Sequence, residues 1–420
     1  MELKKYKKKR IIPKGWKEIS IGDVFRTSSG ATPLTTEKEY YEGGDIPWVN
    51  SGELISPFVY KTSNHITQKG YENSSTEVYP INTVLVAMYG ATAGKVSMLK
   101  IEACTNQAIC AILPNVKFCP EFIKYSLDSL YEYLVGLSSG SARDNLSQAG
   151  LKKLKLVLPK TKREQNELIS ILSLLDRKIE LNKQINDNLE AMAKQLYDYW
   201  FVQFDFPNEE GKPYKSSGGD MVWNEKLKRE IPQGWSDCKL KDFINLFDSK
   251  RVPLSSKDRG ERQGVYPYYG ATGIMDYVND YIFDGDYILL AEDGSTSDAK
   301  GFPIVQYIWG KNWVNNHAHI ILPKNERYMM FTYQMLRSIP AKQIETGSIQ
   351  KKISQENLCG YKMVLPNSDL LEKYENVVSP LWEKRKRCIE EINALTKQRD
   401  ELLPLLMNGQ ASVNYHLSDD

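Results

Sequence analysis

Apolar residues follow two different rhythms along the chain, and the two rhythms alternate twice. Residues 12–158 and 231–365 contain short apolar runs, such as 83–88 and 287–290, separated by Gly, Pro and Asn. Runs of this length between turn residues are typical of β-strands. These two regions are therefore predicted to be mixed, β-rich globular domains.

Two other segments show the three- and four-residue spacing of a helix with one apolar stripe. Residues 163–206 contain neither Gly nor Pro, and Thr161 with Glu164 forms a capping box that predicts a helix start. The second segment, about 368–408, carries apolar residues at seven-residue steps and is followed by Gly409, a residue that often ends helices. Each globular region is thus followed by one long helix.

The two helices are expected to pack together as an antiparallel coiled coil. The predicted interface consists of side chains on the two stripes: Leu168, Leu172, Leu175, Ile179, Asn182, Leu189, Leu196, Leu381, Cys388, Leu395 and Leu402. Asn182 either pairs across the interface and fixes its register or lies solvated at the helix edge. Pro380 and Pro404 predict a kink or break in the second helix, because an interior proline removes a backbone hydrogen bond.

The chain also repeats its own sequence. Pro13-Lys14-Gly15-Trp16 returns as Pro232-Gln233-Gly234-Trp235, and three further short matches follow in the same order. They pair residues 105–107 with 314–316, 139–141 with 346–348, and 157–159 with 364–366. Four ordered matches predict two copies of one scaffold, related by a pseudo-two-fold axis if their helices are antiparallel.

The predicted fold class is therefore α+β, with two tandem domains separated and followed by long helices. The expected boundaries are 1–160 for the first domain, 161–206 for the central spacer helix, 207–366 for a linker and the second domain, 367–410 for the C-terminal helix and 411–420 for a tail.

Composition restricts the possible functions. The 420 residues carry a net charge of only +2, so a nucleic-acid binder would need local clusters of positive charge or a basic partner. The six cysteines form no Cys-x-x-Cys pair, and neither disulfides, a metal site nor a cofactor is expected. No apolar stretch is long enough to span a membrane and the basic start lacks a signal-peptide core, so a cytoplasmic location is predicted.

The chain resembles the specificity subunits of type I restriction-modification systems over essentially its whole length. The resemblance rests on the domain–helix–domain–helix order, the two Pro-x-Gly-Trp openings, the segment 196–206 (LYDYWFVQFDF) and the ending 402–410 (LLPLLMNGQ). It implies two target-recognition domains that each read one half of an asymmetric, bipartite double-stranded DNA target. It also implies two partner adenine-N6 methyltransferase subunits and, optionally, two restriction/translocase subunits.

Such a subunit would not be catalytic. The chain contains no Asn/Asp-Pro-Pro-aromatic motif for methyl transfer to a flipped base and no phosphate-binding Lys-Ser/Thr loop. The alternative is a two-headed coiled-coil scaffold whose ligand is not DNA. The salt dependence of ligand binding distinguishes these two hypotheses, because phosphate contacts make the affinity for DNA fall steeply with salt concentration.

Candidate DNA contacts are polar and aromatic side chains at the repeated anchors and in glycine-containing turns. They are Tyr89, Lys95, Asn106, Gln107, Arg143, Tyr269, Asn315, Asn316, Gln350, Lys351 and Lys352. For Asn106 and Asn315 a role in capping turns is at least as well supported. His317 and His319 are interpreted as core or surface histidines, because no Cys or carboxylate spacing near them completes a metal site.

Overall fold

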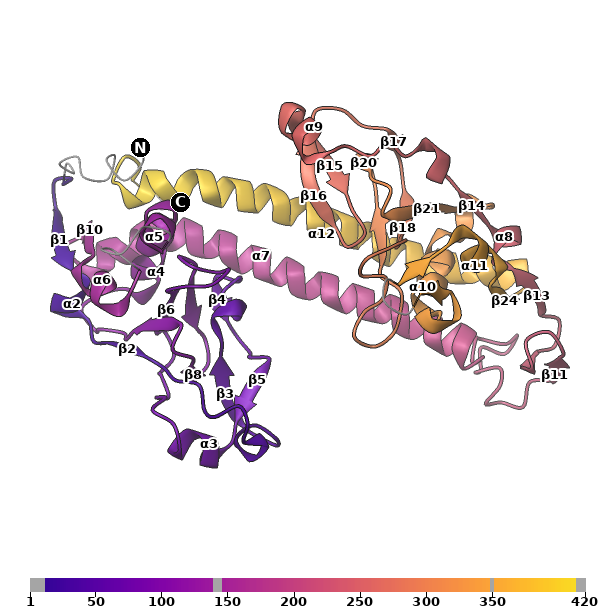
Figure 1. The fold of residues 1–420 in the computed structure, drawn as a ribbon, viewed down its shortest axis with the longest axis horizontal. Helices are drawn as coiled ribbons and strands as arrows, with labels where there is room; N and C mark the ends of the chain where they lie inside the picture. The colour runs from indigo at the N-terminus through magenta and orange to yellow at the C-terminus, as the bar shows by residue number, and fades with distance from the viewer. Residues whose placement is uncertain (1–11, 139–145, 348–350, 413–420) are drawn as a thin grey trace, which may run out of the picture. The chain divides into compact units, whose positions relative to one another are not determined.

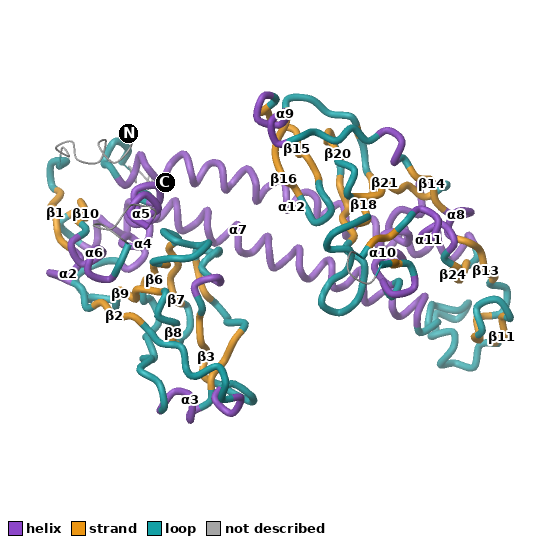
Figure 2. The backbone as a smooth tube through the Cα atoms, in the orientation of Figure 1, coloured by secondary structure: helices purple, strands orange, loops and turns teal. Residues whose placement is uncertain are grey.

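The computed structural model describes residues 12–138, 146–347 and 351–412, and its contacts divide the chain into two compact units (Figure 1). Unit 1 consists of residues 1–183 and 390–420, and unit 2 of residues 184–389. Each unit combines one globular domain with one end of each long helix, as the colouring by secondary structure shows (Figure 2). The sequence therefore passes from unit 1 to unit 2 and back.

Unit 1 contains a five-stranded sheet in the order β2-β9-β6-β7-β4, a three-stranded sheet β5-β3-β8, and the pair β1-β10. The strands are β1 (Trp16–Ser20), β2 (Thr27–Ser29), β3 (Ile46–Val49), β4 (Phe58–Val59), β5 (Asn64–Ile66), β6 (Val84–Ala87), β7 (Val96–Leu99), β8 (Cys104–Thr105), β9 (Ile109–Ile112) and β10 (Lys155–Pro159). Its short helices are α2 (Ile21–Val24), α3 (Gln68–Glu72), α4 (Pro120–Asp128), α5 (Tyr131–Ser138) and α6 (Gln148–Lys153), with 3₁₀ turns η1 (Lys38–Tyr40) and η2 (Ser51–Glu53).

The apolar runs of unit 1 form the centre of its larger sheet. Every residue of β6, β7 and β9 is buried, as expected for strands covered on both faces. One side of this sheet packs with α4 and with Ile169, Leu172, Leu406 and Met407 of the long helices. The core thereby joins the domain to its own end of the helix pair.

Unit 2 contains two four-stranded sheets, β14-β21-β18-β19 and β16-β15-β20-β17, with the pairs β13-β24, β11-β12 and β22-β23. The strands are β11 (Met221–Asn224), β12 (Arg229–Pro232), β13 (Ser236–Lys239), β14 (Ile244–Leu246), β15 (Gln263–Tyr269), β16 (Ile274–Val278), β17 (Phe283–Asp284), β18 (Tyr287–Ala291), β19 (Val305–Ile308), β20 (Lys311–Val314), β21 (Ala318–Pro323), β22 (Glu345–Thr346), β23 (Lys352–Ile353) and β24 (Lys362–Leu365). Its short helices are α8 (Leu240–Phe243), α9 (Ser256–Glu261), α10 (Met329–Ser338) and α11 (Gln355–Gly360), with 3₁₀ turns η4 (Asp248–Lys250), η5 (Glu326–Tyr328) and η6 (Ala341–Gln343).

The two long helices are α7 (Lys162–Tyr197) and α12 (Ser368–Met407), and they run antiparallel within each unit. In unit 1, Arg399 donates to Asp176 over 3.1 Å. In unit 2, Arg385 donates to Glu190 over 2.8 Å. Later residues of α7 thus meet earlier residues of α12, which confirms the predicted antiparallel pairing.

The predicted interface side chains lie largely between the helices or against the domain cores. Six are buried: Leu172, Ile179, Asn182, Leu189, Cys388 and Leu395. Leu168, Leu196 and Leu402 are partly buried against the cores, and Leu175 and Leu381 are also partly buried. Asn182 donates to Glu391 across the helix pair over 2.8 Å, so of its two interpretations the paired one is confirmed.

Two details of the helix predictions are wrong. α7 ends at Tyr197, is followed by a π-helical turn η3 (Asp198–Val202), and does not continue to residue 206. The reason is packing: Trp200, Phe201, Phe204 and Phe206 all enter the core of unit 2, and Phe204 adopts a positive φ of 66°. Of the predicted kink or break in α12, the break is absent, because the helix continues past both Pro380 and Pro404 to Met407. Val378 and Trp382, on either side of Pro380, are buried.

Among the described residues, no helix has both the length and the apolar character that crossing a membrane requires. All six cysteines are reduced, and four of them are buried.

Candidate nucleic-acid interface

Three segments of unit 1 meet where β3 and β6 end and β9 begins. The backbone N–H of Asn106 donates to the carbonyl of Val49 over 3.0 Å, and that of Met88 donates to the carbonyl of Ala108 over 2.8 Å. The Thr92 hydroxyl also donates to the Ser51 carbonyl over 2.7 Å. We call this surface edge 1 and define it as residues 50–53, 88–95 and 106–108. It brings together all the described candidate contacts of the first domain: Tyr89, Lys95, Asn106 and Gln107.

Unit 2 has a corresponding surface. The backbone N–H of Asn315 donates to the carbonyl of Tyr269 over 3.0 Å, and that of Glu292 donates to the carbonyl of His317 over 2.8 Å. A β-bridge between Asp293 and Lys352 adds a further segment. We call this surface edge 2 and define it as residues 269–273, 292–297, 315–317 and 351–353. It contains the described candidates of the second domain: Tyr269, Asn315, Asn316, Lys351 and Lys352.

The two edges have the same backbone construction. In each, a parallel strand pair ends beside the asparagine: β3 with β8 in unit 1, and β15 with β20 in unit 2. In each, an antiparallel pair adjoins it: β6 with β9, and β18 with β21. Asn106 is therefore equivalent to Asn315, which confirms the sequence match between residues 105–107 and 314–316.

The two Tyr-Gly-Ala-Thr segments, residues 89–92 and 269–272, do not occupy equivalent positions in their domains. Tyr89 follows β6 and corresponds to Asp293, whereas Tyr269 ends β15 and corresponds to Val49. Four matching letters could not reveal this, because strand pairing depends on the order of strands along the whole domain. Tyr89 nevertheless lies in edge 1, and Tyr269 lies in edge 2.

The candidates of edge 1 differ in how exposed their polar atoms are. Tyr89 is 50% exposed, and the Lys95 ammonium is also exposed, 4.4 Å from the centroid of the Tyr131 ring. Gln107 is exposed, with its Oε1 accepting from the Thr32 hydroxyl over 2.6 Å. Asn106 instead caps its own turn, since its Oδ1 accepts from the backbone N–H of Ala108 over 3.2 Å. Tyr89, Lys95 and Gln107 are thus the side chains that a ligand could reach.

In edge 2, Asn315 is only 3% exposed and its Oδ1 accepts from the backbone N–H of His317 over 2.8 Å. Its turn-capping alternative is therefore the one that the geometry supports. Tyr269 is half-buried, and burial raises the pKa of its hydroxyl. Asn316, Lys351 and Lys352 are exposed. Arg143 and Gln350 lie outside the described residues.

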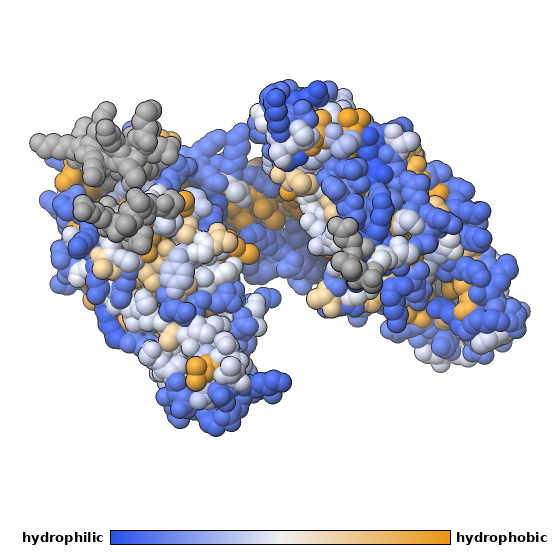
Figure 3. Space-filling view, in the orientation of Figure 1, coloured by the Kyte–Doolittle hydropathy of each residue, from blue (hydrophilic) through white to orange (hydrophobic). Residues whose placement is uncertain are grey.

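Edge 2 carries two lysine–carboxylate ion pairs and one histidine–carboxylate contact that the sequence did not indicate. Lys351 lies 3.1 Å from Glu345, Lys352 lies 3.1 Å from Glu292, and the half-exposed His317 lies 2.6 Å from Asp293. In the space-filling view, the surface over α9 of unit 2 is mostly hydrophilic, with a small hydrophobic group beside it (Figure 3). Spacing along the chain gave no signal for these pairs, because their partners come from different strands.

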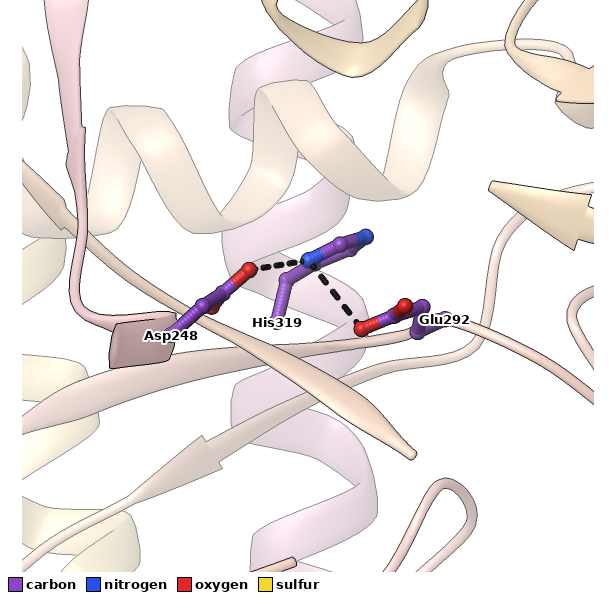
Figure 4. A group of neighbouring side chains, drawn as sticks. All are labelled: Asp248, Glu292 and His319. Carbon is purple, nitrogen blue, oxygen red and sulfur yellow. Dashed lines mark hydrogen bonds and ion pairs between the residues drawn. The ribbon is translucent and has the colours of Figure 1, made fainter. Parts of the chain in front are cut away.

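His319 is fully buried in β21, and two carboxylates flank it (Figure 4). Its Nδ1 lies 2.6 Å from Asp248 and 3.7 Å from Glu292. The interpretation of His319 as a core or surface histidine is confirmed, since it is fully buried. Its carboxylate neighbours could not be found from local spacing, because Asp248 is 71 residues away in sequence. The residue types could hold a metal ion, so the state of each ligand atom decides whether they do.

The ligand atoms of this group are already engaged with protein groups. His319 Nε2 lies 2.8 Å from the carbonyl of Ile353, which can only accept, so this nitrogen donates. Glu292 is paired with Arg251 over 2.7 Å and with Lys352, and two cations would repel a metal ion. The group is therefore an ion-pair network, and it does not fit a metal site.

Comparisons with known proteins agree with this geometry. A family model described as the type I restriction modification DNA specificity domain matches residues 13–191 and 232–375. The specificity subunit of the type I restriction enzyme MjaIX of Methanocaldococcus jannaschii is 28% identical, over 96% of this chain and 95% of that one. The specificity subunit of the EcoprrI enzyme of Escherichia coli is 21% identical, over 87% of this chain and 89% of that one. The crystal structure of a type I restriction-modification S subunit from M. genitalium covers 95% of this chain and 97% of its own, with 20% identity and a TM-score of 0.56.

Proposed function

This chain belongs to the type I restriction modification DNA specificity family, and from that premise we propose that edges 1 and 2 each read one half of a bipartite DNA target. The observation that carries the proposal is the repeated construction of the two edges, with the same backbone hydrogen bonds around Asn106 and Asn315. A surface that keeps its backbone while its side chains change suits recognition of different base sequences.

The two halves of the target are proposed to be unlike. Edge 1 offers Tyr89, Lys95 and Gln107, whereas edge 2 offers Asn316, Lys351 and Lys352. Lysine donates to guanine and to phosphate, and Asn and Gln recognise adenine through paired hydrogen bonds. Different sets of donors and acceptors therefore select different bases, and the target is asymmetric.

The chain is proposed to act as the non-catalytic specificity subunit of a larger enzyme. Two adenine-N6 methyltransferase subunits, and in a restricting system two restriction/translocase subunits, are its proposed partners. α7 alone has 36 residues, about 54 Å at 1.5 Å per residue. A spacer of this length exceeds one turn of B-DNA, about 34 Å, and is therefore proposed to set the unread gap between the half-sites.

A mobility-shift titration against salt tests whether the ligand is DNA. Neutralising phosphates releases counterions, so the logarithm of the binding constant should fall linearly with the logarithm of salt concentration. The double substitution Lys351→Ala/Lys352→Ala should reduce the steepness of that slope by about two. Binding that ignores salt would contradict the proposal.

Lys212→Ala serves as the matched control. Lys212 is also an exposed lysine paired with a glutamate, Glu210 at 2.8 Å, but it lies in the linker between α7 and β11, away from edge 2. The salt dependence of DNA binding by the Lys212→Ala variant should have the same slope as that of the unsubstituted chain.

A further inference from the structure

The ion-pair network of unit 2 connects three of the four segments of edge 2, residues 292–297, 315–317 and 351–353. Asp248 Oδ2 lies 2.6 Å from His319 Nδ1, and Asp248 Oδ1 accepts from the backbone N–H of Ile320 over 2.9 Å. The Gln355 side chain donates to Asp248 over 2.5 Å. His319 Nε2 reaches the carbonyl of Ile353 over 2.8 Å. His319 thus ties β21, next to the Asn315 turn, to the segment that carries Lys351 and Lys352.

Arg251 ties residues 292–297 and 315–317 to the same network. Its Nη1 donates to Glu292 over 2.7 Å, to the carbonyl of Ala318 over 2.9 Å and to the carbonyl of Asn316 over 3.2 Å. Lys352 pairs with the other carboxylate oxygen of Glu292 over 3.1 Å. The backbone of Asn316, a proposed DNA contact, is therefore held directly by one member of the network.

The hydrogen bonds require His319 to carry two ring protons. Both of its partners, the Asp248 carboxylate and the Ile353 carbonyl, are acceptors, so both ring nitrogens donate. Burial alone would lower the pKa of His319, but these hydrogen bonds and the carboxylates of Asp248 and Glu292 raise it above its ordinary value. Hydrogen bonds from His319, Ile320 and Gln355 in turn keep the pKa of Asp248 low despite its burial.

The first domain has no such network at the equivalent positions. Ser29 pairs with Cys110 in the register of β2 and β9, and Met88 precedes the turn of edge 1. By the shared strand pairings, these residues correspond to Asp248, His319 and Glu292. Burial raises the pKa of the Cys110 thiol to about 12, so this side chain is neutral at physiological pH. Among the described residues at these equivalent positions, the charged network is therefore found in the second domain and not in the first.

We propose that His319 is a positioning residue for DNA reading by the second domain, and that its second proton makes this half of the recognition, and only this half, sensitive to alkaline pH. The inference rests on the proposed function of edge 2. Loss of that proton turns one ring nitrogen from a donor into an acceptor facing the carboxylate of Asp248 or the carbonyl of Ile353. Either contact then becomes repulsive, and the segments that it joins separate.

The direction of the pH effect follows from the sign of the shift. A histidine whose pKa is raised by folding stabilises the folded arrangement fully at pH values below the unfolded pKa, 6.5. That stabilisation is lost as the pH rises through the higher folded pKa. The carboxylates of Asp248 and Glu292 face His319, and Arg251 and Lys352 pair with them. Although burial alone would raise the pKa of both carboxyls, their hydrogen bonds hold it below the ordinary value, so both stay ionised while His319 titrates.

Nuclear magnetic resonance of the full chain with ¹⁵N-labelled histidine tests the protonation directly. The ring of His319 should show two protonated nitrogens at pH 7, and its signal should be missing from the His319→Gln spectrum, which assigns it. A neutral His319 ring at pH 7 would overturn the proposal, whatever the variants do.

A methylation assay with the partner methyltransferase tests the positioning role, once the target has been mapped. Discrimination against single mismatches is measured in each half-site from pH about 6 to about 9.5. With the unsubstituted chain, discrimination in the second half should fall as the pH rises, while the first half serves as an internal control for the pH profile of the methyltransferase.

Two variants separate positioning from general damage. His319→Gln keeps one amide donor but carries no charge. It should lower discrimination against mismatches in the second half-site by about tenfold at pH 7, because it leaves a buried acceptor without its hydrogen bond. The triple variant Asp248→Ser/Glu292→Met/His319→Cys introduces the neutral set of the first domain and should abolish the pH dependence. The exposed His65→Gln in unit 1 is the control and should leave both halves unchanged.

The outcomes distinguish this inference from the proposed function. If no bipartite motif depends on the chain, the proposed function fails. If the motif is present but both halves respond equally to pH and to His319→Gln, DNA reading stands and the positioning role of His319 is refuted.

Discussion

At the scale of single residues, a buried ion network joins the first domain to its end of the helix pair. Asp176 of α7 has a fully buried side chain that accepts from Tyr125 over 2.7 Å and from Arg399 over 3.1 Å. The buried Lys124 of α4 lies 3.6 Å from the same carboxylate. One carboxylate therefore holds groups from α4 and α12, which orients the domain on the helices of unit 1.

Asp176→Ala is predicted to destabilise unit 1 by about 3–5 kcal/mol, because it leaves buried partners without their counter-charge. Native-state hydrogen exchange of amides in α4 and β6 measures this loss. The exposed Asp187→Ala on the same helix should change stability by no more than about 0.5 kcal/mol. Equal effects of the two substitutions would show that the Asp176 network does not hold the domain.

Residue patterns predicted part of the candidate site. The asparagine anchors were found because both copies keep them to build the same turn. The carboxylates around His319 were not found, because Asp248 and Glu292 approach it only after β14, β18 and β21 have paired. Sequence spacing identifies contacts within one element, but contacts between strands depend on the order of the strands in the sheet.

At the scale of elements, the helices were predictable because their signals are local. The capping box is confirmed, with the backbone N–H of Glu164 donating to the Thr161 hydroxyl over 3.2 Å and the Glu164 carboxylate accepting from the N–H of Thr161 over 3.1 Å. The end of α7 was not predictable, because the aromatic residues that follow Tyr197 are apolar enough to continue the helical stripe. Tertiary packing of those rings in unit 2 overrides the helical pattern.

Close approach of two strands in unit 1 gives a second prediction. A Cβ on Gly30, which follows β2, would lie 1.8 Å from the carbonyl oxygen of Thr105 in β8. Gly30→Ala should therefore force the backbones apart and cost at least about 2 kcal/mol. Thermal unfolding of the full chain, with hydrogen exchange to assign the loss to unit 1, checks this.

Gly260→Ala is the matched substitution in unit 2. Gly260 lies in α9, and no atom lies within 4 Å of the added Cβ. It should be neutral or stabilise unit 2 by up to about 1 kcal/mol, as expected for glycine replaced by alanine within a helix. A larger loss from Gly260→Ala than from Gly30→Ala would contradict this description of the packing.

At the scale of the whole molecule, the length of the two long helices is proposed to set the distance between the two half-sites of the target. Inserting one heptad after Lys183 in α7 and another after Ile389 in α12 keeps the antiparallel pairing and lengthens it by about 10.5 Å. The unread gap of the target should grow by about three base pairs, since each pair adds about 3.4 Å. Methylation mapping with the lengthened chain measures the gap.

Insertion into α7 alone is the control for this experiment. It shifts the register of the helix pair without a compensating insertion, and should abolish specific methylation. A gap that stays unchanged after the paired insertion would mean that the helices do not set the spacing.

Each domain is proposed to read its own half of one bipartite target, and an exchange of the first domain tests this proposal. The chain is expressed with its methyltransferase partner, methylated adenines are mapped across the host genome, and the map is repeated after residues 12–158 are replaced by the same region of a relative. We expect a bipartite motif with a fixed gap, in which the exchange alters one half and leaves the other half and the gap unchanged. Methylation that does not depend on this chain, or an exchange that alters both halves together, would contradict it.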